Sequence, residues 1–223
     1  MRRFNRICSL ILFLIASETG FAYSEVDLER LLDTNGCNGC DLSGVNLSSR
    51  NFRGAHLKEV DLTGADLRAV DLRWADLEGA KMGKANLVGA DLNSADLSYV
   101  KLGRASLDGA NLSNANLYQV DLYRASTKGI VLVNANLHGA QLSRLNLSSV
   151  NLTASNLSSA NLSYCNLIGA QLVDADLFGA NLRGAKLRFA DLSSANLAGA
   201  DFRGADLEGA SLDGAIIAGA RFP

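Results

Sequence analysis

Cys37 and Cys40 are the residues of this sequence best suited to covalent chemistry, because they form a C-x-x-C motif. In an exported protein this spacing predicts a local disulfide, and a pair of reduced thiols is the alternative. A thioredoxin-like redox site is disfavoured because no βαβ pattern surrounds the motif. A zinc site is disfavoured because two thiols supply only half of the usual ligands. Cys165 occupies a position that we expect to be buried and inert.

His56 and His138 are the two histidines of the chain. Catalysis by either one would require a nucleophile, a base and an orienting group that converge in a pocket. Carboxylates such as Asp61, Asp66 and Asp71 recur with the sequence repeat described below, so we expect them on solvated surfaces. The sequence therefore predicts a protein that is not an enzyme, with no catalytic residues, no cofactor and no metal site.

Four basic residues recur at steps of 20 positions and are here called the basic ladder: Lys84, Arg104, Arg124 and Arg144. If the chain closes one coil every 20 residues, their side chains stand in a column, flanked by Lys81 and Lys101. Like charges at that spacing repel by up to about 1 kcal/mol in water. Either each cation is solvated or paired with an acid such as Asp121 or Asp108, or the ladder binds an anionic partner. Such a partner would be a lipid head group, an acidic polymer or an acidic protein face.

The overall charge is close to balanced, with 21 basic and 23 acidic residues and a formal net charge of −2. Without residues 1–24, 18 basic and 22 acidic residues remain, a net charge of −4. So mild a charge predicts neither nucleic-acid binding nor close mimicry of a phosphate backbone.

A five-residue unit, small–polar–Leu–x–x, runs from Cys40 to the last residues without insertion or deletion. Its central position recurs every fifth residue from 42 to 222, and Leu fills 31 of these 37 positions. Two residues earlier, Ala fills 25 of the 37 positions. The residues that replace the central Leu are Phe52, Met82, Thr127, Phe202, Ile217 and Phe222. A period of five fits neither an amphipathic helix nor an alternating strand.

The unit instead predicts one short extended piece and one corner. Small-x-Leu places two side chains on one face of an extended backbone. The next two residues, such as Glu78-Gly79, suit a turn. Repeated, this describes a polygonal coil whose stacked turns bury the Leu and Ala side chains and pair their backbones at about 4.8 Å per coil.

Units such as Ala65–Ala69 (ADLRA) and Ala195–Gly199 (ANLAG) closely resemble the pentapeptide-repeat family, A-(D/N)-L-x-x. The resemblance implies an all-β fold for residues 40–223, a right-handed, four-sided parallel β-helix of about nine coils with 20 residues per coil. Such a rod would be roughly 40–45 Å long. Some members of the family resemble B-form DNA and bind DNA gyrase.

Residues 1–24 resemble a secretory signal peptide. Three arginines precede an apolar run over residues 7–16, and small residues follow at Ala22 and Ser24. The apolar run is too short for an ordinary membrane-spanning helix, although an uncleaved anchor is the alternative. The sequence therefore predicts an exported protein, periplasmic or extracellular.

Residues 25–39 are expected to cap the first coil, as a short helix followed by the C-x-x-C segment. The stretch 25–33 carries acidic residues in its first turn, which favours a helix start, and Gly36 is placed to end the helix. Four apolar side chains fall on about one helical face: Val26, Leu28, Leu31 and Leu32. Such a cap would cover the open, apolar end of the β-helix.

The last coil carries Ile216 where Asp or Asn is usual. An apolar end is expected to be covered, so the sequence suggests a homodimer through Ile216, Ile217 and Phe222. The alternative is that Phe222 plugs its own coil and Pro223 blunts the edge. Near Thr127, the apolar residues of the segment 128–133 indicate either an exposed patch or an imperfect coil with a shifted backbone.

Together these features predict a non-enzymatic structural or binding scaffold of the cell envelope. The rod would present columns of side chains to an unknown protein or envelope-surface partner, with no nucleic acid expected. Gyrase binding by DNA mimicry is the alternative function, and the predicted export and the balanced charge both argue against it.

Overall fold

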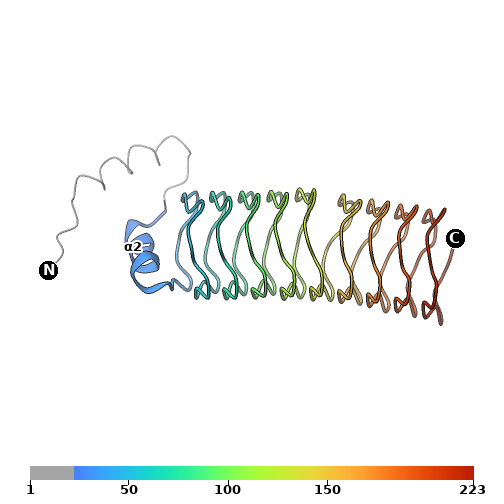
Figure 1. Ribbon diagram of the computed structural model, residues 1–223. Helices are drawn as coiled ribbons and strands as arrows, with labels where there is room; N and C mark the ends of the chain where they lie inside the picture. Colours follow the sequence, from blue (N-terminus) through green and yellow to red (C-terminus); the bar gives the residue numbers. More distant parts are fainter. Residues whose placement is uncertain (1–22) are drawn as a thin grey trace.

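The computed structural model describes residues 23–223, which form a rod with a single helix, α2, across one end (Figure 1). Each five-residue unit contributes one bridge residue and one two-residue turn. Bridge residues pair in parallel with residues 20 positions further on, from Gly36–His56 to Asp201–Arg221. Because a corner follows every five residues, a step of 20 gives four sides per coil. Each side is too short for a continuous strand, and the described residues form isolated bridges instead.

The corners explain which residues flank each central Leu. The second turn residue has a left-handed backbone, with φ of 70° at Gly44 and 62° at Arg104. The outward Asp or Asn before the Leu accepts the backbone N–H of the first turn residue, as Asn151 Oδ1 does from Thr153 N at 3.0 Å. Short polar side chains are suited to this local bond, so the Asp/Asn position of the repeat closes each corner.

The interior is a continuous column of Leu and small residues. Leu77, Leu97 and Ala110 are each 0% exposed. One large and one small side chain from each side fill the narrow cross-section at every level, as close packing requires. Phe202 replaces Leu in a late coil and is also fully buried.

Helix α2 spans Glu25–Thr34 and lies across the end of the rod next to the first coil (Figure 1). Ser24 caps its start, since its Oγ accepts from Asp27 N at 3.2 Å. The helix is tied to the first coil at Asp41, whose N–H donates to Asp27 Oδ2 at 3.1 Å and whose carbonyl accepts from Ser24 N at 3.0 Å. The helix ends at Thr34 and Asn35 is its C-cap, with φ of 54°, so the prediction that Gly36 stops the helix was wrong by one residue. Asn tolerates the left-handed conformation well enough to replace Gly there.

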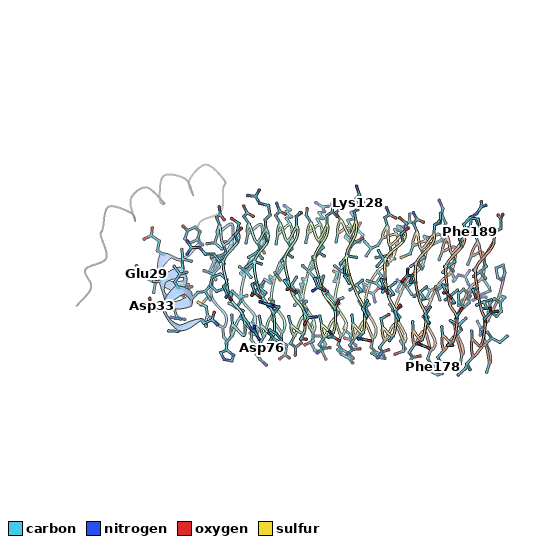
Figure 2. The ribbon with its side chains drawn as sticks, viewed as in Figure 1. Glu29, Asp33, Asp76, Lys128, Phe178 and Phe189 are labelled. Atoms are coloured by element: carbon cyan, nitrogen blue, oxygen red, sulfur yellow. A yellow bond between two sulfur atoms is a disulfide. The ribbon has the colours of Figure 1, made fainter. Side chains whose placement is uncertain are left out.

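The predicted apolar face of α2 is narrower than its sequence pattern indicates. Leu31 is 1% exposed and Leu28 is partly buried, but Val26 and Leu32 are 68% and 48% exposed. A single short helix crossing the end of a rod contacts it along one stripe, so residues at the edge of the apolar arc remain in solvent. Glu29 and Asp33 point away from the rod (Figure 2).

The backbone pairing between coils is interrupted at one place, between residues 124–130 and residues 143–151. The bridge between Ser126 and Asn146 is absent, although Ser106–Ser126 and Asn146–Asn166 are present. The sequence left two interpretations for the Thr127 region, an exposed apolar patch and an imperfect coil. Val131 is 36% exposed, as the first expects, and the missing bridge beside it agrees with the second. Figure 1 shows the wider spacing of the coils in the yellow part of the rod.

Residues 1–22, which carry most of the predicted signal peptide and Cys8, lie outside the described residues. Across residues 23–223, no helix is both long enough and apolar enough to cross a membrane.

Leu31→Ala is expected to weaken the docking of α2 by about 2–5 kcal/mol, because it removes the buried side chain between the helix and the first coil. Amide hydrogen exchange of residues 37–45 should then become faster. Leu32→Ala is the matched control, and its effect should stay within about 0.5 kcal/mol because that side chain is exposed. Equal effects of the two substitutions would contradict this account of the cap.

Candidate binding surface

The C-x-x-C segment lies directly beneath α2. Cys37 and Cys40 form a disulfide with a Cα–Cα distance of 5.5 Å, and both are buried. The sulfur atoms and a carboxylate oxygen of Asp27 lie within 4.8 Å of one another. Sulfurs joined in a disulfide are not thiolate ligands, and the Asp27 carboxylate already accepts from Asp41 N. The cluster therefore fits a structural staple at the cap.

His138 has a potential nucleophile beside it, with Nδ1 2.8 Å from Ser158 Oγ. The Ser158 hydroxyl has a single proton, however, and Oγ lies 2.6 Å from Asn156 Oδ1, which can only accept. His138 must then donate to Ser158, so it does not act as a base toward it. No other described side chain bonds to the His138 ring. His56, the second histidine, is exposed on an early coil. The hydrogen bond between His138 and Ser158 therefore has a structural role.

An aromatic column occupies the same corner as His138 and is called here the aromatic corner: Tyr99, Tyr118, His138 and Phe178. The Tyr118 ring stacks on His138 at 5.3 Å and meets Tyr99 edge-on at 5.4 Å. Tyr99 and Phe178 are half exposed or more. In Figure 2, Phe178 and Phe189 project from opposite edges of the rod.

The basic ladder forms one column of left-handed corner residues, with φ between 58° and 64°. Within residues 23–223, none of its four cations forms an ion pair or a side-chain hydrogen bond, and the same holds for Lys101. Pairing with Asp121 or Asp108 is not observed. Asp121 instead accepts from Tyr123 N, and Asp108 accepts from Ser126 Oγ and Lys128 N. Lys81 differs, since it pairs with Asp61 at 3.4 Å.

Several other arginines of the rod are neutralised by nearby acids. Arg203 donates through Nε and Nη2 to both oxygens of Asp201, at 2.8 and 2.6 Å. This hydrogen bond holds the pKa of Asp201 well below its usual value, and Arg68 lowers the pKa of Asp66 in the same way. Cations without an ion pair also occur elsewhere among residues 23–223, such as Arg50 and Arg221, but the basic ladder places four of them in successive coils of one column.

Aromatic rings flank the ladder without neutralising it. The Arg124 guanidinium lies 5.1 Å from the Tyr123 ring centroid, and that of Arg144 lies 5.3 Å from the Tyr164 ring. The Tyr164 ring also covers Gly184, where an added Cβ would come within 2.6 Å of it. Cation–π contacts orient a guanidinium while leaving its N–H donors available.

The ladder and the aromatic corner bound one side of the rod, called here the basic side. The bridge residues between them are Lys81, Lys101, Asp121 and Gln141. In each coil the chain passes from the aromatic corner to a bridge residue and then to the ladder residue. In one coil, for example, these three are His138, Gln141 and Arg144, so the two corners lie at the two ends of one side. Cations, aromatic rings and few acids are thus gathered on one surface in the middle of the rod.

Two further features carry no chemistry. Cys165 is fully buried, and desolvation raises the pKa of its thiol to about 12. This confirms that it is unreactive at neutral pH, as expected for a core position. A hollow between α2 and the first coils is lined by Leu31, Leu32, Asn35, Arg50, Asn51, Phe52 and Arg53. Its lining contains no nucleophile, carboxylate or histidine.

Pentapeptide repeats, in eight copies, match residues 40–79, 71–109, 90–126, 115–153, 155–189 and 190–223. No curated protein matches the sequence. HetL, a pentapeptide repeat protein involved in heterocyst differentiation regulation from the cyanobacterium Nostoc sp. strain PCC 7120, is 31% identical, with 90% of this chain and 95% of HetL covered and a TM-score of 0.44.

Two other solved structures are more distant. Rfr23, a pentapeptide repeat protein from the cyanobacterium Cyanothece 51142, is 28% identical over 88% of this chain and 97% of its own, with a TM-score of 0.27. QnrB1, a plasmid-mediated fluoroquinolone resistance protein, is 18% identical over 81% of this chain and 92% of its own, with a TM-score of 0.31.

The repeat matches span nearly all of residues 40–223. Pentapeptide-repeat proteins form right-handed quadrilateral β-helices and are in general non-enzymatic structural or binding proteins. The 20-residue pairing step, the four sides and the Leu and Ala interior agree with that fold. This chain belongs to the pentapeptide-repeat family.

Proposed function

We propose that this protein is a non-enzymatic binding scaffold of the cell envelope, whose basic side binds an anionic partner. The observation that carries the proposal is the basic ladder, a column of four stacked cations that form no ion pair among residues 23–223, whereas arginines such as Arg68 and Arg203 are paired. Stacked like charges are unfavourable for the isolated protein, and an anionic partner would remove that repulsion.

The rod is well suited to such a role because its side chains are presented by a rigid backbone. Each coil is hydrogen-bonded to the next, so the ladder has little freedom to lose on binding. The flanking rings of Tyr123 and Tyr164 restrict two of the guanidinium groups further. Because the cations are exposed, binding should weaken as salt concentration rises.

The envelope location is part of the proposal and has two supports. The first is the signal-like sequence of residues 1–24. The second is the Cys37–Cys40 disulfide, since disulfides persist in oxidising compartments. The alternative, gyrase binding by DNA mimicry, needs a cytoplasmic chain with an acidic surface, and the basic side opposes it.

Cell fractionation with mass spectrometry of the intact chain tests the location. We expect a product that begins near Tyr23 or Glu25 in the exported fraction. Its mass should be lower by two hydrogens than that of the reduced chain, because of the disulfide. A full-length chain in the cytoplasm would contradict the proposal, and gyrase inhibition would then be the relevant assay.

Replacing three ladder arginines with serine (Arg104→Ser, Arg124→Ser and Arg144→Ser) should abolish binding to anionic probes, because it removes three of the four cations of the ladder. Heparin and vesicles that contain an anionic phospholipid serve as the probes. The matched control is Arg68→Ser, Arg73→Ser and Arg188→Ser, which removes the same charge from ion-paired positions. Unchanged binding by the ladder variant, or an equal loss in the control, would reject the basic side as the binding surface.

The same scaffold is proposed to form a homodimer through its last coil. Ile216 and Ile217 are 57% and 52% exposed there. Phe222 stacks on Phe202 at 5.3 Å yet remains 36% exposed, so it fills its own coil only in part. The surface therefore combines apolar side chains with the open edge of a parallel ladder, which a second copy would cover.

Multi-angle light scattering at micromolar concentration should show twice the chain mass, and Ile217→Asp should yield a monomer because it places a charge in the apolar contact. Val26→Asp is the control, since Val26 is 68% exposed at the opposite end of the rod. A monomeric unmodified chain would rule out this dimer.

A further inference from the structure

The interruption of the backbone ladder is confined to one side of the rod. Elsewhere, from Cys37 to Arg221, backbone N–H groups bond to the adjacent coil in a constant pattern. Five bonds of that pattern are absent between two successive coils: Arg124 N to Ser143 O, Thr127 N to Asn146 O, Gly129 N to Ser148 O, Asn146 N to Ala125 O and Asn151 N to Ile130 O. All five cross the same side and its two corners.

Overpacking beneath this side explains the separation. Leu145 occupies the inward small-residue position that is Ala in coils before it, such as Ala105 and Ala125. On the neighbouring side, Ile130 and Val150 also exceed Ala in volume. Extra methylene groups in a close-packed interior force the backbone to move. The coils therefore stand apart here rather than closing at the usual spacing.

Thr127 compensates for part of the loss. It takes a central position that is otherwise apolar, and its Oγ1 donates to Asn146 O at 2.8 Å. The hydroxyl thus satisfies the carbonyl that the Thr127 N–H would normally bond. The amide hydrogen of Arg124, at the exposed corner, has no such replacement among the described residues.

The corner formed by Tyr123 and Arg124 is suited to an anion. Backbone N–H groups in turns form concave sites that attract negative charge, and here the Arg124 N–H has lost its usual acceptor. Arg124 and Arg144, whose backbones lie on either side of the gap, are exposed and form no ion pair among residues 23–223. Asp121 is the one opposing charge bonded at this corner, and its Oδ1 accepts from Tyr123 N at 2.9 Å.

The other corner of the gap is less suitable. Gly129 has also lost its backbone acceptor, and the Asp108 carboxylate accepts from Lys128 N at 2.8 Å, as Asp121 does from Tyr123 N at the first corner. Lys128 is the one cation of this corner in the two coils, whereas the first corner has two arginines to outweigh its carboxylate. The gap therefore has one favourable end, which adjoins the basic ladder.

We propose that the gap between Arg124 and Arg144 is a specific site for one anionic group, a phosphate or a carboxylate. The Arg124 N–H and the guanidinium groups of both arginines donate to its oxygens. The inference rests on the proposed anionic-partner function and adds to it a single position where the backbone also takes part. The ladder positions on either side bind by charge alone, because their amides remain paired, as Arg104 N is to Tyr123 O at 2.8 Å.

Inorganic phosphate and acetate, titrated separately into the isotope-labelled full chain, test the site by NMR. We expect the Arg124 amide to shift with saturation, and the stronger of the two ions indicates whether the natural group is a phosphate or a carboxylate. Arg144→Ser should weaken binding about ten-fold, the usual value of a hydrogen bond to a charged group. Arg104→Ser, a ladder cation beside an intact backbone, should change it less than about three-fold.

Leu145→Ala tests the contribution of the gap independently of the charge, because this substitution retains every cation. Relief of the overpacking should restore slow hydrogen exchange at Thr127 and Asn146 and weaken binding about ten-fold, because the Arg124 N–H regains its acceptor. Slow hydrogen exchange at Thr127 and Asn146 together with unchanged anion binding would overturn the site. If hydrogen exchange at Thr127 and Asn146 stays fast in Leu145→Ala, the comparison of Arg144→Ser with Arg104→Ser decides whether the site exists. Equal losses of anion affinity in those two variants would overturn the site. If the site fails while the triple ladder variant still loses heparin binding, the proposed function stands without it.

Discussion

The structure depends on one constraint, the pairing of every coil with the next through backbone hydrogen bonds at a fixed spacing. That spacing is set by the backbone and not by the side chains, so the interior must fill the same volume at every level. One Leu and one Ala per side meet this requirement in most coils, and Val replaces Ala at some positions, such as Val100 and Val120, without loss of the pairing. The sequence therefore repeats because the coil spacing is fixed. The stability of such a rod is approximately a sum over neighbouring coils, so a local misfit alters one interface and leaves the others unchanged.

The same constraint decides what the outer surface can do. Two of every five side chains point inward, and the outward Asp or Asn is used to close a corner, as Asn151 does for Thr153. The remaining positions repeat in columns, which favours extended binding surfaces over pockets. The His138–Ser158 contact illustrates this, because neighbours in a column meet frequently without a third group to organise them for catalysis.

The period, the Leu and Ala columns and the alignment of the basic ladder could be predicted from sequence, because each follows from spacing alone. The details of the cap could not. The helical pattern identified four apolar residues but could not show that only Leu31 is fully buried and Leu28 partly so, since that depends on how the helix crosses the coil. Asn35 was overlooked as the helix end because Gly36 is the commoner signal. The gap did leave a signal in the sequence, namely Leu145 and Thr127 in positions reserved for Ala and Leu.

Departures from a strict repeat carry information because the repeat is otherwise so uniform. Leu145 and Thr127 weaken the stacking of two coils, and the basic ladder adds repulsion on the same coils. A sequence shaped by stability alone would place Ala at 145 and interleave acids among the cations, as it does at Asp201 and Arg203. Two independent costs thus coincide at Arg124 and Arg144. Natural proteins accept local instability chiefly where a site needs it, and an anion bound in the gap would relieve both costs together.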